Sequence, residues 1–212
     1  MRIFSITLQH KVLLDMDTNT HSEDLRAIRK IMEESSRFLS LSGLSGVFAG
    51  IFALAGSAIA WLSIRNNELA GVSDLDLILF FDALAVLVAT LAMGVYLSYR
   101  KAARTGSRIW SVTVRRMLTN LLIPLVSGAV FILFFYLHRN YNYIIPSMLI
   151  FYGLALVSAG RFTFGEIHYL GILEVLTGIL ALIFPGLAIF LWAFGFGLLH
   201  ILYGLIMHRK YR

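Results

Sequence analysis

The most informative segment of the sequence is residues 169–207, YLGILEVLTGILALIFPGLAIFLWAFGFGLLHILYGLIM. Its one acidic residue is Glu174, its one histidine is His200, and its main interruption is Pro185-Gly186. About 20 apolar residues of helix cross the core of a bilayer, so this stretch is too long for one span. Proline followed by glycine favours a tight turn. The stretch therefore predicts two antiparallel membrane-spanning helices that meet at Pro185-Gly186.

The rest of the chain has the same apolar character. Of its 212 residues 58% are apolar and 14% are charged, and the mean hydropathy is +0.79. Such a composition lies outside the usual range for a soluble domain. We predict an all-α, polytopic helical membrane protein with six transmembrane helices, at 40–64, 77–98, 117–137, 143–159, 169–184 and 187–207.

The chain divides into a charged cytoplasmic lead (1–39), the transmembrane bundle (40–207) and a basic tail (208–212). In the lead, Thr20-His21-Ser22-Glu23 matches a capping box and precedes apolar residues on one helical face. This pattern predicts a short amphipathic helix on the membrane surface, with a partner-binding or dimerising helix as the alternative. Residues 1–18 lack the apolar core of a secretory signal, and Met1 and Met16 stay as alternative translation starts.

The basic residues are distributed unevenly between the two sides of the predicted spans. Sixteen of the eighteen Lys and Arg residues fall on the side of both termini, and only Arg65 and Arg139 fall on the other. Cytoplasmic loops of membrane proteins carry such an excess, so we expect both termini in the cytoplasm and the protein in a bacterial inner membrane. The net charge of +6 predicts contact with anionic lipid head groups, and no nucleic-acid recognition motif is present.

Small residues predict where helices pack. Gly43, Gly46 and Gly50 recur on one face of the first span, and such faces let helices approach closely. We predict a helix-packing face here, which is also a candidate surface for a homo-oligomer. The second span repeats the spacing with Asp82, Ala85, Ala89, Ala92 and Tyr96.

Three acidic or histidine side chains within the spans fall on small-residue faces. Asp82 lies on the face of the second span, Glu174 shares a face of the fifth span with Gly171 and Gly178, and His200 shares a face of the sixth span with Ala193, Gly197 and Gly204. Glu174 and His200 lie at similar distances from Pro185, and their axial levels differ by only about 6 Å at helical rise. We expect the two side chains to meet, and two interpretations stay open. The pair is a polar clamp, helped by Thr177, or it is a proton or cation site to which Asp82 contributes.

Several classes of chemistry have no support in the sequence. The chain has no cysteine, which excludes disulfides and thiolate metal sites. No nucleotide-binding, metalloprotease or hydrolase motif appears, and one Glu with one His makes a poor metal site. We expect no catalytic residue, no cofactor and no metal.

One enzyme alternative is based on a resemblance. Gly43-Leu44-Ser45-Gly46 followed by Gly50 resembles the nucleophile segment of rhomboid intramembrane proteases, and the segment after His200 resembles the span of their catalytic histidine. The resemblance implies a serine protease using Ser45 and His200. Rhomboids place the serine on a late span, however, and their other motifs are absent here. The protease is therefore a remote alternative.

A short motif recurs in the odd-numbered spans, as LSGV at 44–47, VSGA at 126–129 and LTGI at 176–179. The recurrence predicts that the six spans form three helical hairpins derived from one unit.

Residues 169–207, with Gly171, Gly178, Pro185 and Gly204, resemble the hairpin unit of HdeD-type acid-resistance membrane proteins. The whole chain resembles uncharacterised bacterial six-span membrane proteins, notably over residues 42–50. The resemblance implies the six-span architecture and stress protection, and no catalytic residue. We expect a non-enzymatic structural, stress-related or regulatory membrane component; the alternative is a small ion-coupled or proton-coupled transporter or channel.

Overall fold

The computed structural model describes residues 42–70, 74–105 and 110–211, which form helices joined by short turns. Within these ranges, six segments are long and apolar enough to cross a membrane, which confirms the all-α, multi-pass fold. The expected amphipathic helix and the rest of the 1–39 lead lie outside the described residues. The elements are α2 (Gly43–Ala70), α3 (Leu75–Thr105), α4 (Val112–Leu137), η1 (Tyr141–Tyr143), α5 (Ile144–Ala159), η2 (Gly160–Phe162), α6 (Gly165–Ile183), η3 (Pro185–Leu187), α7 (Ala188–Trp192), η4 (Ala193–Leu199) and α8 (His200–Lys210).

The predicted turn at Pro185-Gly186 is confirmed, because α6 ends at Ile183 and the 3₁₀ turn η3 leads into α7. Several helices run further than their apolar segments. α3 continues to Thr105, α4 begins at Val112 and α8 ends at Lys210. Hydropathy marks only the part of a helix in hydrocarbon, whereas long basic side chains reach head groups from a helix that continues beyond it.

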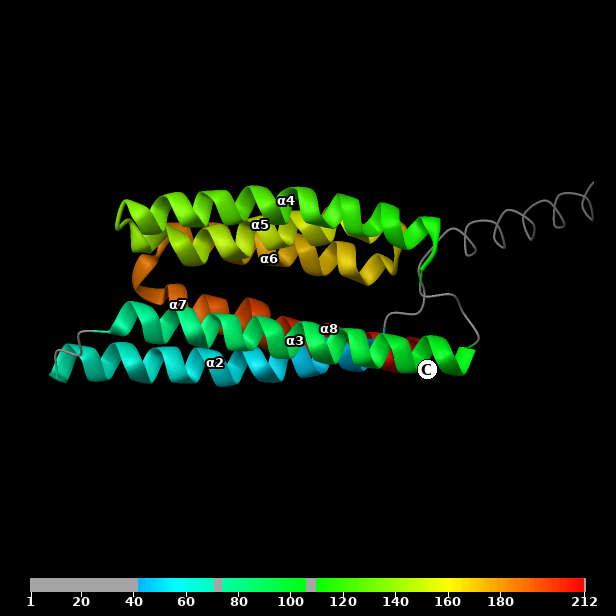
Figure 1. Ribbon diagram of the computed structural model, residues 1–212, viewed down its shortest axis with the longest axis horizontal. Helices are drawn as coiled ribbons and strands as arrows, with labels where there is room; N and C mark the ends of the chain where they lie inside the picture. Colours follow the sequence, from blue (N-terminus) through cyan, green and yellow to red (C-terminus); the bar gives the residue numbers. More distant parts are fainter. Residues whose placement is uncertain (1–41, 71–73, 106–109, 212) are drawn as a thin grey trace, which may run out of the picture. The chain divides into compact units, whose positions relative to one another are not determined.

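The helices form two layers of three, one with α4, α5 and α6 and the other with α3, α2 and the last span from α7 to α8 (Figure 1). α5 is the central helix of the first layer and α2 of the second. The closest contacts join α5 with α6 and α2 with the last span, so they connect helices from different predicted hairpins. The beginning of α2 lies against the end of α8, which places both ends of the described bundle on the same side.

Glycines allow the backbones of α2 and α8 to touch. A Cβ atom on Gly46 would lie 3.2 Å from Gly204 Cα, and one on Gly50 would collide with Gly197 O. Gly43 faces Gly204 and His208 in the same way. The predicted packing face therefore exists, but the last span of the same chain covers it. The suggestion of a homo-oligomer through this face is corrected, because the surface is not free for a second copy.

A second glycine contact joins α5 and α6. A Cβ atom on Gly153 would lie 2.6 Å from Gly171 O, and one on Gly171 would lie 2.6 Å from Gly153 O. Gly178 continues this contact along α6, where a Cβ atom would lie 2.9 Å from Ile150 N. Each layer thus contains a helix pair in which glycines bring the two backbones into contact.

Asp82 lies on the face of α3 that meets α2, half-buried beside Gly56. The small-residue face predicted with it is only partly right, because Ala85, Ala92 and Tyr96 are exposed. The half-buried positions of α3 instead step through Leu79, Asp82, Val86, Ala89, Met93 and Leu97. The half-buried face of α3 is therefore determined by its contact with α2 and not by the positions of small residues.

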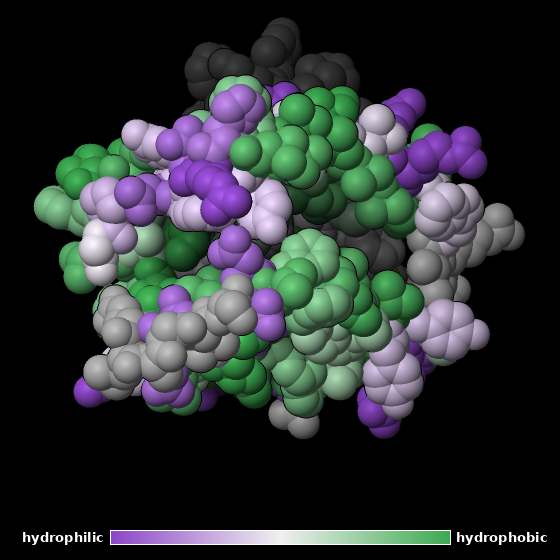
Figure 2. Space-filling view, turned by 60° about the vertical axis from the view of Figure 1, so that its left-hand side comes forward, coloured by the Kyte–Doolittle hydropathy of each residue, from purple (hydrophilic) through white to green (hydrophobic). Residues whose placement is uncertain are grey.

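The two ends of the bundle differ in charge. One end carries Asp74 and Asp76 with Arg65 and Arg139, and Figure 2 shows polar side chains gathered there beside the apolar flanks of the helices. The other end carries the remaining basic residues of the described ranges, Arg100, Lys101, Arg104, Arg115, Arg116, Arg161, Arg209 and Lys210. The asymmetry predicted from the sequence is therefore present in three dimensions.

We expect Gly50→Ala to destabilise the protein by about 1–3 kcal/mol, because the new methyl group collides with backbone atoms that cannot move away separately. Gly94→Ala is the matched control, since nothing lies within 4 Å of its Cβ position. Alanine favours a helix over glycine, so this variant should be neutral or slightly stabilised. Thermal unfolding in detergent micelles measures the difference, and equal midpoints for the two variants would contradict the glycine contact.

Candidate functional site

A cluster of three polar side chains lies inside the bundle. Glu174 of α6, His200 of α8 and Tyr152 of α5 form it, and we call it the polar cluster. His200 Nδ1 lies 3.3 Å from Glu174 Oε1, and the Tyr152 hydroxyl lies 2.8 Å from His200 Nε2. Glu174 is 0% exposed and His200 is 6% exposed. The predicted meeting of Glu174 and His200 is thus present in the structure.

The polar cluster lies where the two layers meet, because Glu174 and Tyr152 belong to one layer and His200 to the other. Two groups of apolar side chains connect the same helices. The first contains Leu156, Phe164, Ile167, Leu170, Leu199 and Met207; the second contains Leu149, Ala181 and Ala188, with Ile145, Leu191 and Phe196 against it. The cluster is thus a polar contact within an otherwise apolar junction.

Local structure provides the space for the carboxyl group. A Cβ atom on Gly195 would lie only 2.6 Å from Glu174 Oε2 and 2.8 Å from Leu149 Cδ2, so any larger residue here would have to displace the ends of these two side chains. Gly195 belongs to η4, a π-helical segment in the middle of the last span. Such wide turns are uncommon in helices and occur often at functional sites. His200 Nδ1 also lies 3.1 Å from Gly195 O.

The hydrogen bonds determine how protons are arranged. Since the Gly195 carbonyl only accepts, His200 Nδ1 must carry a hydrogen and donate it there. In neutral His200 the other nitrogen, Nε2, then accepts from the Tyr152 hydroxyl. Within the described residues, neither carboxylate oxygen of Glu174 has a hydrogen-bond donor. Thr177 does not help, as its hydroxyl donates to Leu173 O at 2.7 Å.

A buried carboxylate without a donor costs much free energy unless it is paired with a cation or protonated. One additional proton satisfies this requirement in either of two places. On His200 it makes an ion pair with Glu174, and on Glu174 it makes a neutral acid. With the hydrogens of the Tyr152 hydroxyl and of His200 Nδ1 in place, one additional proton therefore makes the polar cluster electrically neutral.

The other candidate residues lie apart from the polar cluster. Asp82 faces α2 from α3, whereas Glu174 and His200 lie between α6 and α8. Ser45 Oγ donates to Ser42 O at 2.5 Å, and no hydrogen bond joins it to His200. The serine–histidine contact of the protease alternative is thus not formed. Among the described residues, no group of three or more His, Asp or Glu side chains could hold a metal ion.

A separate ion pair lies at the basic end. Lys210 Nζ lies 2.6 Å from Glu166 Oε1, and the Tyr211 hydroxyl lies 3.1 Å from both oxygens of the same carboxylate. This group ties the end of α8 to the first turn of α6. The Lys210 side chain is 59% exposed, and exposed ion pairs contribute little to stability.

Two residues of the polar cluster and its surroundings were not predicted from the sequence. Tyr152 lies in the middle of the fourth span, away from the membrane boundaries where tyrosines usually gather. That position was an available signal, because a buried tyrosine hydroxyl needs a hydrogen-bond partner. Gly195 carried no such signal, since glycine is frequent throughout this chain.

Comparisons of the chain with protein-family models, with curated proteins and with solved structures find no match. The fold and the site thus define a class only: a multi-pass helical membrane protein with a buried titratable cluster between two helical layers.

We expect Tyr152→Phe to lower the free energy of unfolding by about 1 kcal/mol, because His200 Nε2 loses its partner inside the bundle. Tyr203→Phe is the matched control: Tyr203 packs against the same apolar junction, and no hydrogen bond is found for its hydroxyl within the described residues. Chemical denaturation in micelles measures both variants, and equal losses would show that the hydroxyl of Tyr152 contributes nothing specific.

Proposed function

We propose that this protein is an integral membrane component without catalytic chemistry, in which the polar cluster acts as a clamp between the two helical layers. The observation that supports the clamp most directly is the complete burial of Glu174 against His200. The clamp and the adjacent apolar groups hold three helices from both layers. A structural, stress-related or regulatory role fits such a protein, and the stress-related part follows from the resemblance to HdeD-type proteins.

The enclosure of the polar cluster favours a clamp over a transport site. A transported ion must reach its site from one side of the membrane and leave it to the other. Glu174 is in contact with His200, and its Oε2 lies beside Gly195, with no exposed surface on the residue. Transport would require the layers to separate at this point.

A small proton-coupled or ion-coupled transporter is the second candidate, and one observation favours it. Among the residues that the structure describes, none donates a hydrogen bond to either oxygen of Glu174, whereas a purely structural clamp would be expected to satisfy its polar atoms. Carboxyl groups within membrane spans often mark proton or ion paths. Asp82 would be a separate point on such a path, because it lies between α2 and α3.

Stability and flux measurements separate the two candidates. If the cluster is a clamp, His200→Ala lowers stability by about 3 kcal/mol because it leaves a buried carboxyl group without its partner. Glu174→Gln removes that charge, so the double variant should recover part of the loss. Liposomes containing the wild-type protein should show no more potential-driven proton flux than empty liposomes, measured with an internal pH-sensitive dye.

Glu166→Gln is the matched control, because it makes the same change in the ion pair at the basic end. It should cost at most about 1 kcal/mol. Proton flux that persists in Glu166→Gln and disappears in Glu174→Gln would overturn the clamp in favour of transport.

The proposed orientation places the basic end in the cytoplasm. The concentration of Arg and Lys at that end supports this proposal through the positive-inside rule. The same residues are suited to contact anionic lipid head groups, and the bacterial inner membrane is the proposed location.

Single cysteines in this cysteine-free chain test the orientation. We expect Asn140→Cys, in the turn after α4, to react with a membrane-impermeant maleimide added to intact cells, because that end faces outward. Thr113→Cys, at the beginning of α4, should react only after the cells are opened. The reverse pattern would show that the protein is inserted the other way.

A further inference from the structure

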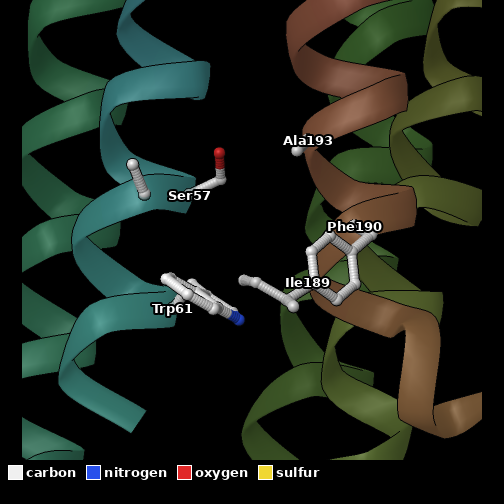
Figure 3. A pocket seen from close by; sticks show the side chains of 6 residues that line it. Ser57, Trp61, Ile189, Phe190 and Ala193 are labelled. Atoms are coloured by element: carbon white, nitrogen blue, oxygen red, sulfur yellow. The ribbon is translucent and has the colours of Figure 1, made fainter. Parts of the chain in front are cut away.

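A half-open groove of about 180 Å³ lies between α2 and the first part of the last span. Ser57, Ala58 and Trp61 line it from α2, and Ile189, Phe190 and Ala193 line it from the other side (Figure 3). All six positions fall within membrane-spanning segments. When these segments cross a membrane, a groove at these positions borders lipid.

The groove begins where the glycine contact between these helices ends. At Gly50 and Gly197 the backbones approach closely, and the side chain of Leu54 covers Gly197. Beyond Leu54, no glycine of one helix faces the other across this gap, and the helices are separated by side chains. Figure 3 shows Trp61 and Ile189 pointing toward one another across the gap, while the space between Ser57 and Ala193 stays open.

The chemistry of the lining selects an apolar occupant. Ser57 is the only hydroxyl in the lining, and it donates to Leu54 O of its own helix at 2.8 Å. The remaining surface is formed by Ala, Ile, Phe and Trp side chains. At this depth the surrounding apolar molecules are lipids, so a fatty acyl chain matches the groove in both polarity and position.

Arg65 supplies a second element of recognition at the end of the groove. Its guanidinium lies 5.3 Å from the centre of the Trp61 ring, one helical turn further along α2. Arg65 is exposed, and within the described part of the chain no carboxylate forms an ion pair with it. Guanidinium groups bind phosphate through paired hydrogen bonds.

We propose that this groove binds one phospholipid with an anionic head group, whose acyl chain lies between α2 and α7 and whose phosphate contacts Arg65. The acyl chain fills the space that the helices leave open, and Trp61 contacts both the chain and the head-group region. The site is independent of the choice between clamp and transporter, because none of its residues belongs to the polar cluster.

Fluorescence quenching tests the proposal on the full chain. Replacing Trp110 and Trp192 by Phe leaves Trp61 as the only tryptophan. The protein is placed in phosphatidylcholine vesicles in which an increasing fraction of the lipid has brominated acyl chains. In one series the brominated lipid is phosphatidylglycerol, and in the other it is phosphatidylcholine. Half-maximal quenching of Trp61 should need about fivefold less brominated phosphatidylglycerol than brominated phosphatidylcholine. This factor corresponds to the roughly 1 kcal/mol contributed by one basic side chain near anionic lipid.

Variants separate a bound lipid from the general lipid surroundings. In Arg65→Gln the two quenching curves should coincide. Ala58→Phe fills the groove and should reduce quenching by both lipids, whereas Ala55→Phe, exposed on the same helix outside the groove, should not. Coincident curves in the parent protein would overturn the proposal. So would a Trp61 that neither lipid quenches, because protein, such as a second copy of the chain, would then cover the groove.

Discussion

A carboxyl group within the hydrocarbon layer must be paired or protonated, and the arrangement of helices around Glu174 satisfies that requirement. His200 comes from the other layer, so the partner of Glu174 is available only when the two layers are in contact. Tyr152 holds the imidazole from its far side, and Gly195 leaves space for the carboxyl group. The junction between the layers is thereby restricted to arrangements that keep these atoms together, a restriction that apolar contacts alone do not impose.

The glycine contacts join helices within each layer, whereas the polar cluster joins the two layers. They set the distance between helices within a layer, through Gly153 and Gly171 in one layer and through Gly50 and Gly197 in the other. Since hydrophobic burial gives little drive for helix association in lipid, close backbone packing has to provide much of the stability. The polar cluster then determines how the two layers are positioned against each other. Different residues therefore set the distance between helices within a layer and the position of one layer against the other.

Much of this architecture could be predicted from the sequence, because it depends on properties along the chain. Hydropathy predicts the spans, Pro185-Gly186 predicts the turn, and helical rise places Glu174 and His200 at similar depths. What failed depends on which helices are neighbours. Gly46 was correctly placed on a packing face, but its partner, α8, could not be derived from one helix alone. The same holds for Tyr152, whose role appears only when α5 lies next to α8.

The π-helical segment Ala193–Leu199 explains how one span takes part in both the groove and the polar cluster. A π-helical turn contains more residues than an α-helical turn, so it changes which face the helix presents before and after it. Before the segment, Ile189 and Phe190 line the open groove toward α2. After it, Gly204 packs tightly on α2 while His200 meets Glu174. Both halves of the span contact α2 and the other layer, since Ala188 packs with Leu149 and Ala181 in the first half. What differs between the halves is how closely the span approaches α2, from which it is separated by side chains at Ile189 and with which it is in backbone contact at Gly204.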